Sequence, residues 1–284
     1  MAKIIAFIDG SLYSESVLDH AAWVANTIGA SVDVVHVIGR RDIDSVPADL
    51  SGNLDMGGHS ALLAQLAEHD RERAKLAQAR GRLIVDAGVA RLLAAGVAEA
   101  HPRLRTGDIV EAIQELEAEA DLIVVGKRGA AADFAKLHLG SNLERVARVS
   151  KKPVMVASRA FKPVKRFLVA FDGGASVMKA IHHIAKGKLF GGLPCTMITA
   201  GKENPDARGK LEAAAGILRA AGYSVDALIE EGEPEDIIAR HAEADHIDLL
   251  VMGAYGHSRV RSFIIGSTTT EMIRSVLIPV MLFR

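Results

Sequence analysis

The chain has 284 residues, which is long for one ordinary domain and comfortable for two. It is 49% hydrophobic and 24% charged, so it can build an aliphatic core and lacks the polar, highly charged composition of a disordered protein. The 34 basic and 35 acidic residues give a net charge of −1. With this net charge the protein has no overall positive potential that would hold a nucleic acid or an anionic membrane, so an anionic ligand must bind at a local site.

Cysteine usage and hydropathy predict the cellular location. Cys195 is the only cysteine, which excludes an intrachain disulfide and a paired-cysteine metal or redox motif. We interpret Cys195 as a buried small hydrophobe, because an apolar run follows it. The apolar run at 4–8 is too short for a signal peptide, and no stretch approaches the roughly 18 apolar residues of a membrane helix. We therefore expect a cytoplasmic protein.

In the first half of the chain, apolar runs alternate with amphipathic stretches. An apolar run at 4–8 precedes apolar residues at helical spacing over 17–28, and a second run follows at 32–38. Residues 51–58 are glycine-rich and predict an irregular loop, whereas residues 61–95 predict a long or broken helix.

The second half has the same alternation. An apolar run at 167–171 precedes Val177, Ile181 and Ile184 at helical spacing, and Pro234 among acidic residues marks the start of a late helix. Continuous aliphatic strands separated by helices are typical of a parallel sheet covered on both faces. The sequence therefore predicts an α/β fold of two Rossmann-like, doubly wound domains. Each would be a mostly parallel five-stranded sheet with helices on both faces.

Three sequence blocks occur twice and in the same order, which indicates an internal repeat. In the third block the glycine-to-proline separation is identical, since 153 − 140 = 13 and 279 − 266 = 13. The pairs are Lys3–Gly10 with Arg166–Gly173, Asp121–Gly129 with Asp248–Gly256, and Gly140, Ser141 and Pro153 with Gly266, Ser267 and Pro279. Chance would rarely preserve order, chemistry and spacing together.

The first copy is longer than the second. Asp9 and Gly126 are 126 − 9 = 117 positions apart, whereas Asp172 and Gly253 are 253 − 172 = 81 apart. We place the extra residues, about 36, in the stretch 39–100. The junction falls in a short polar, proline-containing step at 158–163, so we predict an N-terminal domain at 1–160 and a C-terminal domain at 161–284.

A candidate ligand site lies where the strands of each copy end. In an open parallel sheet, ligands bind beyond the carboxyl ends of the strands, where the strand order reverses. Asp9 and Asp172 end the first strand of each copy, and Gly126 and Gly253 end the fourth. In the second copy a hydroxyl-rich run at 267–270 then leads into a helix. Free backbone N–H groups and hydroxyls at a helix N-terminus predict an anion site, and we expect phosphate there.

A structural interpretation of the same residues stays open. The glycines could serve tight turns alone, and Ser267 could be a helix N-cap. Asp172 could likewise cap the helix expected to begin near Ser176. Repetition of the whole arrangement favours the ligand site.

This pattern resembles the universal stress protein family, here in tandem and over essentially the whole chain. The signature is Asp-Gly-Ser at the end of the first strand, Gly-x2-Gly-x9-Gly-Ser/Thr after the fourth, and a last strand containing Pro-Val. The second copy has the complete glycine signature but has Gly174 where the first copy has Ser11. The resemblance implies a stress-response or regulatory module that binds ATP or AMP, alone or with Mg²⁺. Carried over, the nucleotide site consists of Asp172, Met252, Gly253, Gly256, His257, Gly266, Ser267 and Thr268.

The first copy departs from this signature. Gly129 and Gly140 enclose ten residues instead of nine, and Asp133 in that loop would repel an anion. We expect the ligand site of the first copy to be empty or differently occupied. Its matching positions are Asp9, Val37, Gly126, Gly129, Gly140, Ser141 and Asn142. The resemblance also implies that the apolar last strands of the two copies pair, so that the tandem forms an intramolecular pseudo-dimer, with further homodimerisation left open.

Two other classes of function remain as alternatives. The chain lacks GxxxxGK[ST], which excludes a P-loop NTPase, and it lacks GxGxxG after the first strand, which argues against a dinucleotide oxidoreductase. No acid, base and nucleophile set repeats in both copies, so we assign no catalytic residue. His182, His183, His241 and His246 are interpreted as surface or core histidines, without a metal site. The alternatives are a nucleotide-free partner-binding scaffold and a slow ATP hydrolase.

Overall fold

The computed structural model describes residues 1–39, 56–127, 141–254 and 267–284. Within them, five strands alternate with four α-helices in each half of the chain, as predicted. The first half contains β1 Lys3–Phe7, α1 Leu12–Ile28, β2 Ser31–Ile38, α3 Met56–Ala94, β3 Ala100–Thr106, α4 Ile109–Leu116, the 3-10 helix η1 Glu117–Glu119, β4 Leu122–Gly126, α5 Ser141–Val149 and β5 Val154–Ala157. The second half contains β6 Phe167–Ala170, α6 Ala175–Lys186, β7 Cys195–Ala200, α7 Pro205–Ala220, β8 Val225–Glu230, α8 Pro234–Ala244, β9 Leu249–Gly253, α9 Ser267–Ser275 and β10 Val280–Phe283.

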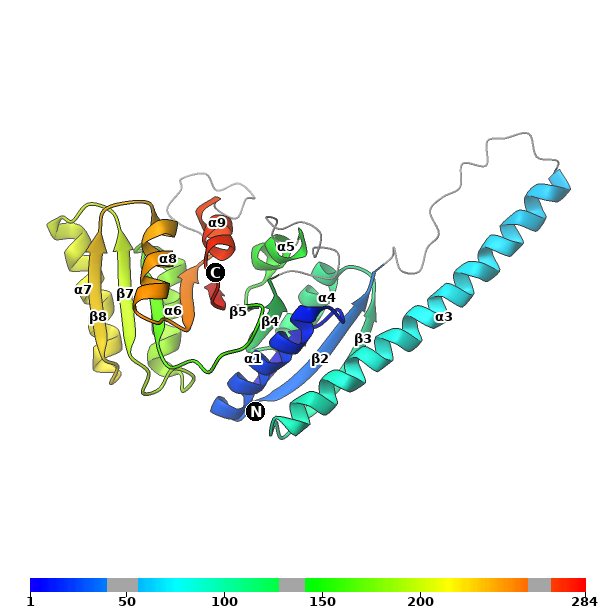
Figure 1. Ribbon diagram of the computed structural model, residues 1–284, viewed down its shortest axis with the longest axis horizontal. Coiled ribbons are helices and arrows are strands. Elements are labelled where there is room, and N and C mark those ends of the chain that lie inside the picture. Colours follow the sequence, from blue (N-terminus) through cyan, green and yellow to red (C-terminus); the bar gives the residue numbers. More distant parts are fainter. Residues whose placement is uncertain (40–55, 128–140, 255–266) are drawn as a thin grey trace.

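The ten strands form one continuous sheet in the order β3-β2-β1-β4-β5-β10-β9-β6-β7-β8 (Figure 1). Within each half all the paired strands are parallel. β1 lies between β2 and β4, and β6 lies between β7 and β9. The strand order therefore reverses beside β1 and again beside β6, and the predicted doubly wound α/β fold is confirmed.

The halves join through β5 and β10, which pair antiparallel with Met281 opposite Met155. All four residues of each strand are buried. Pairing covers two apolar strands that would otherwise be exposed sheet edges. The outer edges are β3 and β8, and β3 contains Pro102, a residue that an edge strand tolerates.

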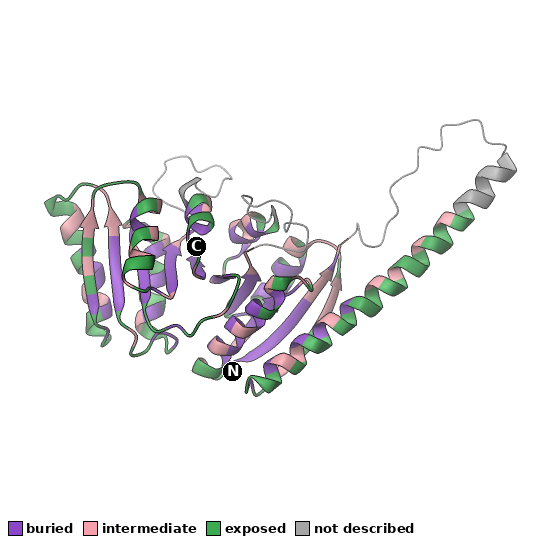
Figure 2. Ribbon diagram, viewed as in Figure 1, coloured by how far each residue is buried: buried purple, intermediate pink, exposed green. Residues whose placement is uncertain are grey.

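Helices cover both faces of the sheet, as predicted. One apolar cluster joins one face of the strands to α1, α3, α6 and α7, and the other joins the opposite face to α4, α5, α8 and α9. Figure 2 shows the buried strands between these partly exposed helices. Phe167 is fully buried in the first cluster, and its ring centroid lies 4.7 Å from that of Phe190. Each strand is apolar on both sides because each side meets a helical layer.

Helix α3 occupies the same place in the first half as α7 in the second, but it is unbroken over 39 residues, whereas α7 has 16. Residues 56–58, which we predicted in an irregular loop, are helical instead, and the rest of that predicted loop lies outside the described residues. The carboxyl-terminal part of α3 packs on β2 and β3. The preceding part of α3 runs past the sheet (Figure 1), and its side chains over 64–80 are mostly exposed (Figure 2).

Two glycines set seven positions apart allow α3 to approach the sheet closely. A Cβ on Gly81 would lie 2.6 Å from Leu104 Cδ1, and a Cβ on Gly88 would lie 2.9 Å from Val34 Cγ1. Both distances are shorter than ordinary carbon contacts of about 3.5 Å or more. None of the helices in the described ranges has the length and apolar character needed to cross a membrane.

Candidate functional site at the carboxyl ends of the strands

In the second half, the corner after β6 presents an exposed carboxylate. β6 ends at Ala170, so Asp172 lies two residues beyond the strand that we predicted it to end. Gly173 turns the chain with φ of +72°, a conformation that favours glycine. The Gly174 backbone amide donates to Asp172 Oδ1 at 2.8 Å. Gly174, not Asp172, is the N-cap of α6, so Asp172 holds the corner and keeps its side chain exposed.

The corresponding corner of the first half is more enclosed. Asp9 Oδ1 accepts hydrogen bonds from the Ser11 amide at 3.0 Å and from Ser14 Oγ at 3.3 Å. Ser11 is the N-cap of α1, and Gly10 has φ of +76°. A Cβ on Gly10 would lie 3.0 Å from Ile84 Cδ1 on α3. Ile84 of α3 therefore lies close to this corner, although Gly10 itself is exposed, and the Asp9 carboxylate is already engaged.

Gly253, at the end of β9, allows the first turn of α6 to approach that strand. A Cβ on Gly253 would lie 3.0 Å from Ser176 Cβ and 3.2 Å from the Val177 backbone nitrogen. Met252 beside it is buried in the core on the opposite face. The contact of Gly253 with α6 brings the Asp172 corner and the end of β9 to one place on the carboxyl edge. The predicted strand-one and strand-four features of the second half are thus adjacent.

The first turn of α9 is anchored to the same edge. Thr269 Oγ1 donates to the Ala254 carbonyl at 3.3 Å, and the Ala254 amide donates to the Phe283 carbonyl at 2.7 Å. Ser267 and Thr268 form the start of α9. The positive end of this helix therefore lies beside the residue that follows β9. Gly256, His257 and Gly266 lie outside the described residues.

The described residues include some of the site positions that we predicted in the first half. Gly126 ends β4, and Ser141 and exposed Asn142 begin α5. Val37 is half-buried near the end of β2 and packs against the core beneath α4 and α5. Gly129, Asp133 and Gly140 lie outside the described ranges.

An ionic cluster lies at the carboxyl end of β8. His241 on α8 contacts Asp245 Oδ2 through Nδ1 at 2.7 Å and Glu230 Oε2 through Nε2 at 2.9 Å. Burial lowers the pKa of His241, but the hydrogen bonds to these two carboxylates outweigh it, and the pKa lies above its ordinary value. In the first half, the hydrogen bond from Arg145 holds the pKa of Asp108, the N-cap of α4, below its usual range.

The other reactive groups singled out in the sequence lie apart from this edge. Cys195 is buried at the start of β7, and burial raises its thiol pKa to about 12, consistent with the predicted hydrophobic role. His182 and His183 are on the exposed side of α6, and the His183 ring packs against Phe283 at 5.3 Å between centroids. His246 is exposed after α8. All four histidines named above lie at the surface or on its margin.

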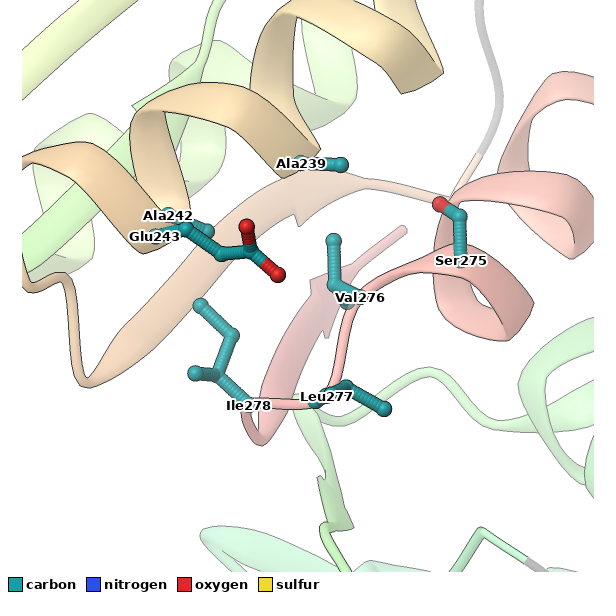
Figure 3. A pocket seen from close by; sticks show the side chains of 7 residues that line it. All are labelled: Ala239, Ala242, Glu243, Ser275, Val276, Leu277 and Ile278. Carbon is teal, nitrogen blue, oxygen red and sulfur yellow. The ribbon is translucent and has the colours of Figure 1, made fainter.

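A small pocket with mixed polar and apolar lining lies between α8 and the turn from α9 to β10, away from the corner at Asp172. Figure 3 shows the Glu243 carboxylate beside Val276 and Ile278, with Leu277 turned outward. Leu277 is 84% exposed. The lining residues are Ala239, Ala242, Glu243, Ser275, Val276, Leu277 and Ile278.

Three residues that contact the elements of the second-half site were missed among the predicted site residues. Thr269 anchors α9, Ser176 contacts the glycine at the end of β9, and Lys127 of the first half donates through Nζ to the Val276 carbonyl at 2.5 Å. Thr269 belongs to the hydroxyl run at 267–270, where helical periodicity requires one residue to face inward. No local signal pointed to Lys127, because its contact joins residues 149 positions apart.

Comparisons with known proteins identify the family and the fold of the chain. The family model described as the universal stress protein family matches residues 1–158 and 196–284. Universal stress protein Slr1230 of Synechocystis sp. is 36% identical over 287 residues, covering 100% of both chains. A universal stress protein structure from Archaeoglobus fulgidus has a TM-score of 0.74 at 23% identity, covering 99% of this chain and 98% of its own. A structure from Pseudomonas aeruginosa, described as a putative universal stress protein, has a TM-score of 0.64 at 17% identity, covering 100% and 93%. The two structures share the fold, and the family model and the full-length relative establish that the chain belongs to the universal stress protein family.

Proposed function

We propose that this chain is a regulatory module for stress responses that binds an adenine nucleotide, ATP or AMP, chiefly in its second half, with or without Mg²⁺. One observation carries the proposal: the close contact between Gly253 and the first turn of α6, which places the Asp172 corner beside the end of β9. The strand order reverses at this position, where open α/β sheets bind their ligands.

The residues there suit the parts of a nucleotide. Exposed Asp172 can accept hydrogen bonds from ribose hydroxyls or from a base, because only the Gly174 amide donates to it within the described ranges. The amides of α9, together with Ser267 and Thr268, suit phosphate oxygens. Met252 and Gly253 end β9 at the same edge, and we include both in the proposed site. From the sequence signature, Gly256, His257 and Gly266 complete the proposed site.

The first half suits a nucleotide less well. Asp9 is engaged by Ser11 and Ser14, and Ile84 of α3 lies over Gly10. We propose that its site, with Asp9, Val37, Gly126, Gly129, Gly140, Ser141 and Asn142, is empty or differently occupied.

We also propose two domains, 1–160 and 161–284, that act as an intramolecular pseudo-dimer. The antiparallel pairing of β5 with β10 supports this, because it joins the two five-stranded halves into one sheet. Nucleotide binding would change a partner-binding surface only if the protein binds nucleotide with different affinity in two conformations of that surface. The same continuous sheet favours, as a second candidate, a partner-binding scaffold that uses no nucleotide.

The test is native mass spectrometry of freshly purified protein, followed by calorimetric titration with ATP, AMP and Mg²⁺. We expect one retained or titrated nucleotide per chain. Two nucleotides would contradict the proposal for the first half. None at millimolar ligand would overturn the nucleotide proposal and favour the scaffold.

A further inference from the structure

Each half of the molecule places a cation at the carboxyl end of a helix in the other half. Lys127, which follows β4, donates through Nζ to the Val276 carbonyl at 2.5 Å. Val276 lies at the end of α9, since its own amide donates to the Met272 carbonyl at 3.2 Å. In the opposite direction, Arg284 NH1 donates to the Arg148 carbonyl in the last turn of α5. The two contacts run in opposite directions across the junction of the halves, from the residue after β4 and from the residue after β10.

The carboxyl end of a helix is where a cation has most effect. The last four carbonyls of an α-helix have no partner within the helix and carry the negative end of its dipole. Lysine and arginine side chains satisfy such carbonyls. Lys127 therefore meets an unpaired carbonyl and the negative end of α9 together.

α9 is short and is held at both ends. It has nine residues and is thus about 14 Å long. Thr269 anchors its first turn to the Ala254 carbonyl, and Met272 and Ile273 of α9 are buried in the core. Lys127 holds its other end and belongs to the other half of the chain. A rigid helix of this length transmits a shift at its carboxyl end to its amino end, where we place the phosphates.

We propose that Lys127 is a positioning residue for the nucleotide site of the second half. Lys127 would hold the carboxyl end of α9 and complement the helix dipole, so that the backbone amides at Ser267 and Thr268 meet phosphate in a fixed position. This inference rests on the proposed function. It assigns the first half a task in a site whose other residues all come from the second half.

The test compares Lys127→Met with Lys127→Arg, which keeps a cation and a donor. Arg284→Met is the matched control, because it removes a cation that reaches the other half at the end of α5 instead of α9. Calorimetry measures the affinity of each full-length variant for ATP and for adenosine. We expect Lys127→Met to bind ATP about two- to fivefold more weakly, the range that a charge at a helix end supports. We expect wild-type affinity for adenosine, and recovery of ATP affinity in Lys127→Arg.

Each result decides the inference. If Lys127→Met binds ATP as tightly as wild type, the positioning role is wrong and the proposed function stands. If it loses ATP and adenosine affinity equally, or if Arg284→Met weakens ATP binding as much, the effect comes from loosened structure and the role is also wrong. If wild-type protein binds neither ligand, the proposed function fails and the inference with it. Unfolding midpoints of all four proteins show whether each variant is folded.

Discussion

Two helical glycines in equivalent layers of the two halves should respond oppositely to alanine. Gly88 lies on the face of α3 that packs on the sheet, and an added Cβ would meet Val34 Cγ1 at 2.9 Å, Ile8 Cδ1 at 3.1 Å and Leu18 Cδ1 at 3.5 Å. Gly216 lies within α7, and an added Cβ would meet no atom within 4 Å. Both residues are within helices, so the change in helix propensity is the same and only the packing differs.

The expected magnitudes follow from two terms. Replacing glycine by alanine inside a helix stabilises by about 1 kcal/mol. At Gly216 nothing opposes this gain, so Gly216→Ala should be more stable by up to about 1 kcal/mol. At Gly88 the added methyl group overpacks the contact between α3 and the sheet, which costs about 1–3 kcal/mol. We therefore expect Gly88→Ala to fall below wild type by up to about 2 kcal/mol and below Gly216→Ala by about 1–3 kcal/mol.

Equilibrium unfolding in urea, followed by far-ultraviolet circular dichroism, measures both variants against wild type. A change in midpoint at constant slope reports stability. If Gly88→Ala is as stable as Gly216→Ala, α3 does not depend on close approach at Gly88, and our explanation of its glycines is wrong. A second crowded position, Gly81→Ala, checks the conclusion, because its Cβ would lie 2.6 Å from Leu104 Cδ1.

Three further predictions concern single side chains. Asp172→Asn should weaken ATP binding about tenfold, the size of a charged hydrogen bond, whereas Asp9→Asn should change it by less than twofold; equal losses in calorimetry would contradict the assignment of the second half. The pKa of His241 is raised in the folded state, so its contribution to stability is complete below about pH 6.5, the ordinary value, and is lost as pH rises through the folded-state value. The stability difference between wild type and His241→Gln in urea should thus be larger at pH 5.5 than at pH 9, and a difference that grows with pH would refute the ion-paired geometry. Cys195, with a pKa of about 12, should resist iodoacetamide at pH 8 in native protein and react in urea; mass spectrometry showing rapid native alkylation would refute its burial.

Much of the fold follows from local patterns. Uninterrupted aliphatic runs such as 4–8 and 167–171 predict strands buried on both sides, and such strands require a parallel sheet between helices. The Asp-Gly corners at Asp9 and Asp172 could be located because each pairs a turn-forming glycine with the end of a strand. These features depend on residues close together in the chain, which is why the sequence predicted them.

The tertiary structure decided what depends on distant residues. It set the register in which β5 and β10 pair, with Met281 opposite Met155, and continued α3 without a break. The contacts of Thr269 and Lys127 could be recognised only from their hydrogen-bond partners in other elements of the structure. The physical reason is that periodicity encodes which face of an element is buried, but not what covers it. The Asp-Gly motif is the same in both halves, but the nearby Ser14 hydroxyl donates to Asp9, and Ile84 of the distant helix α3 lies close to Gly10.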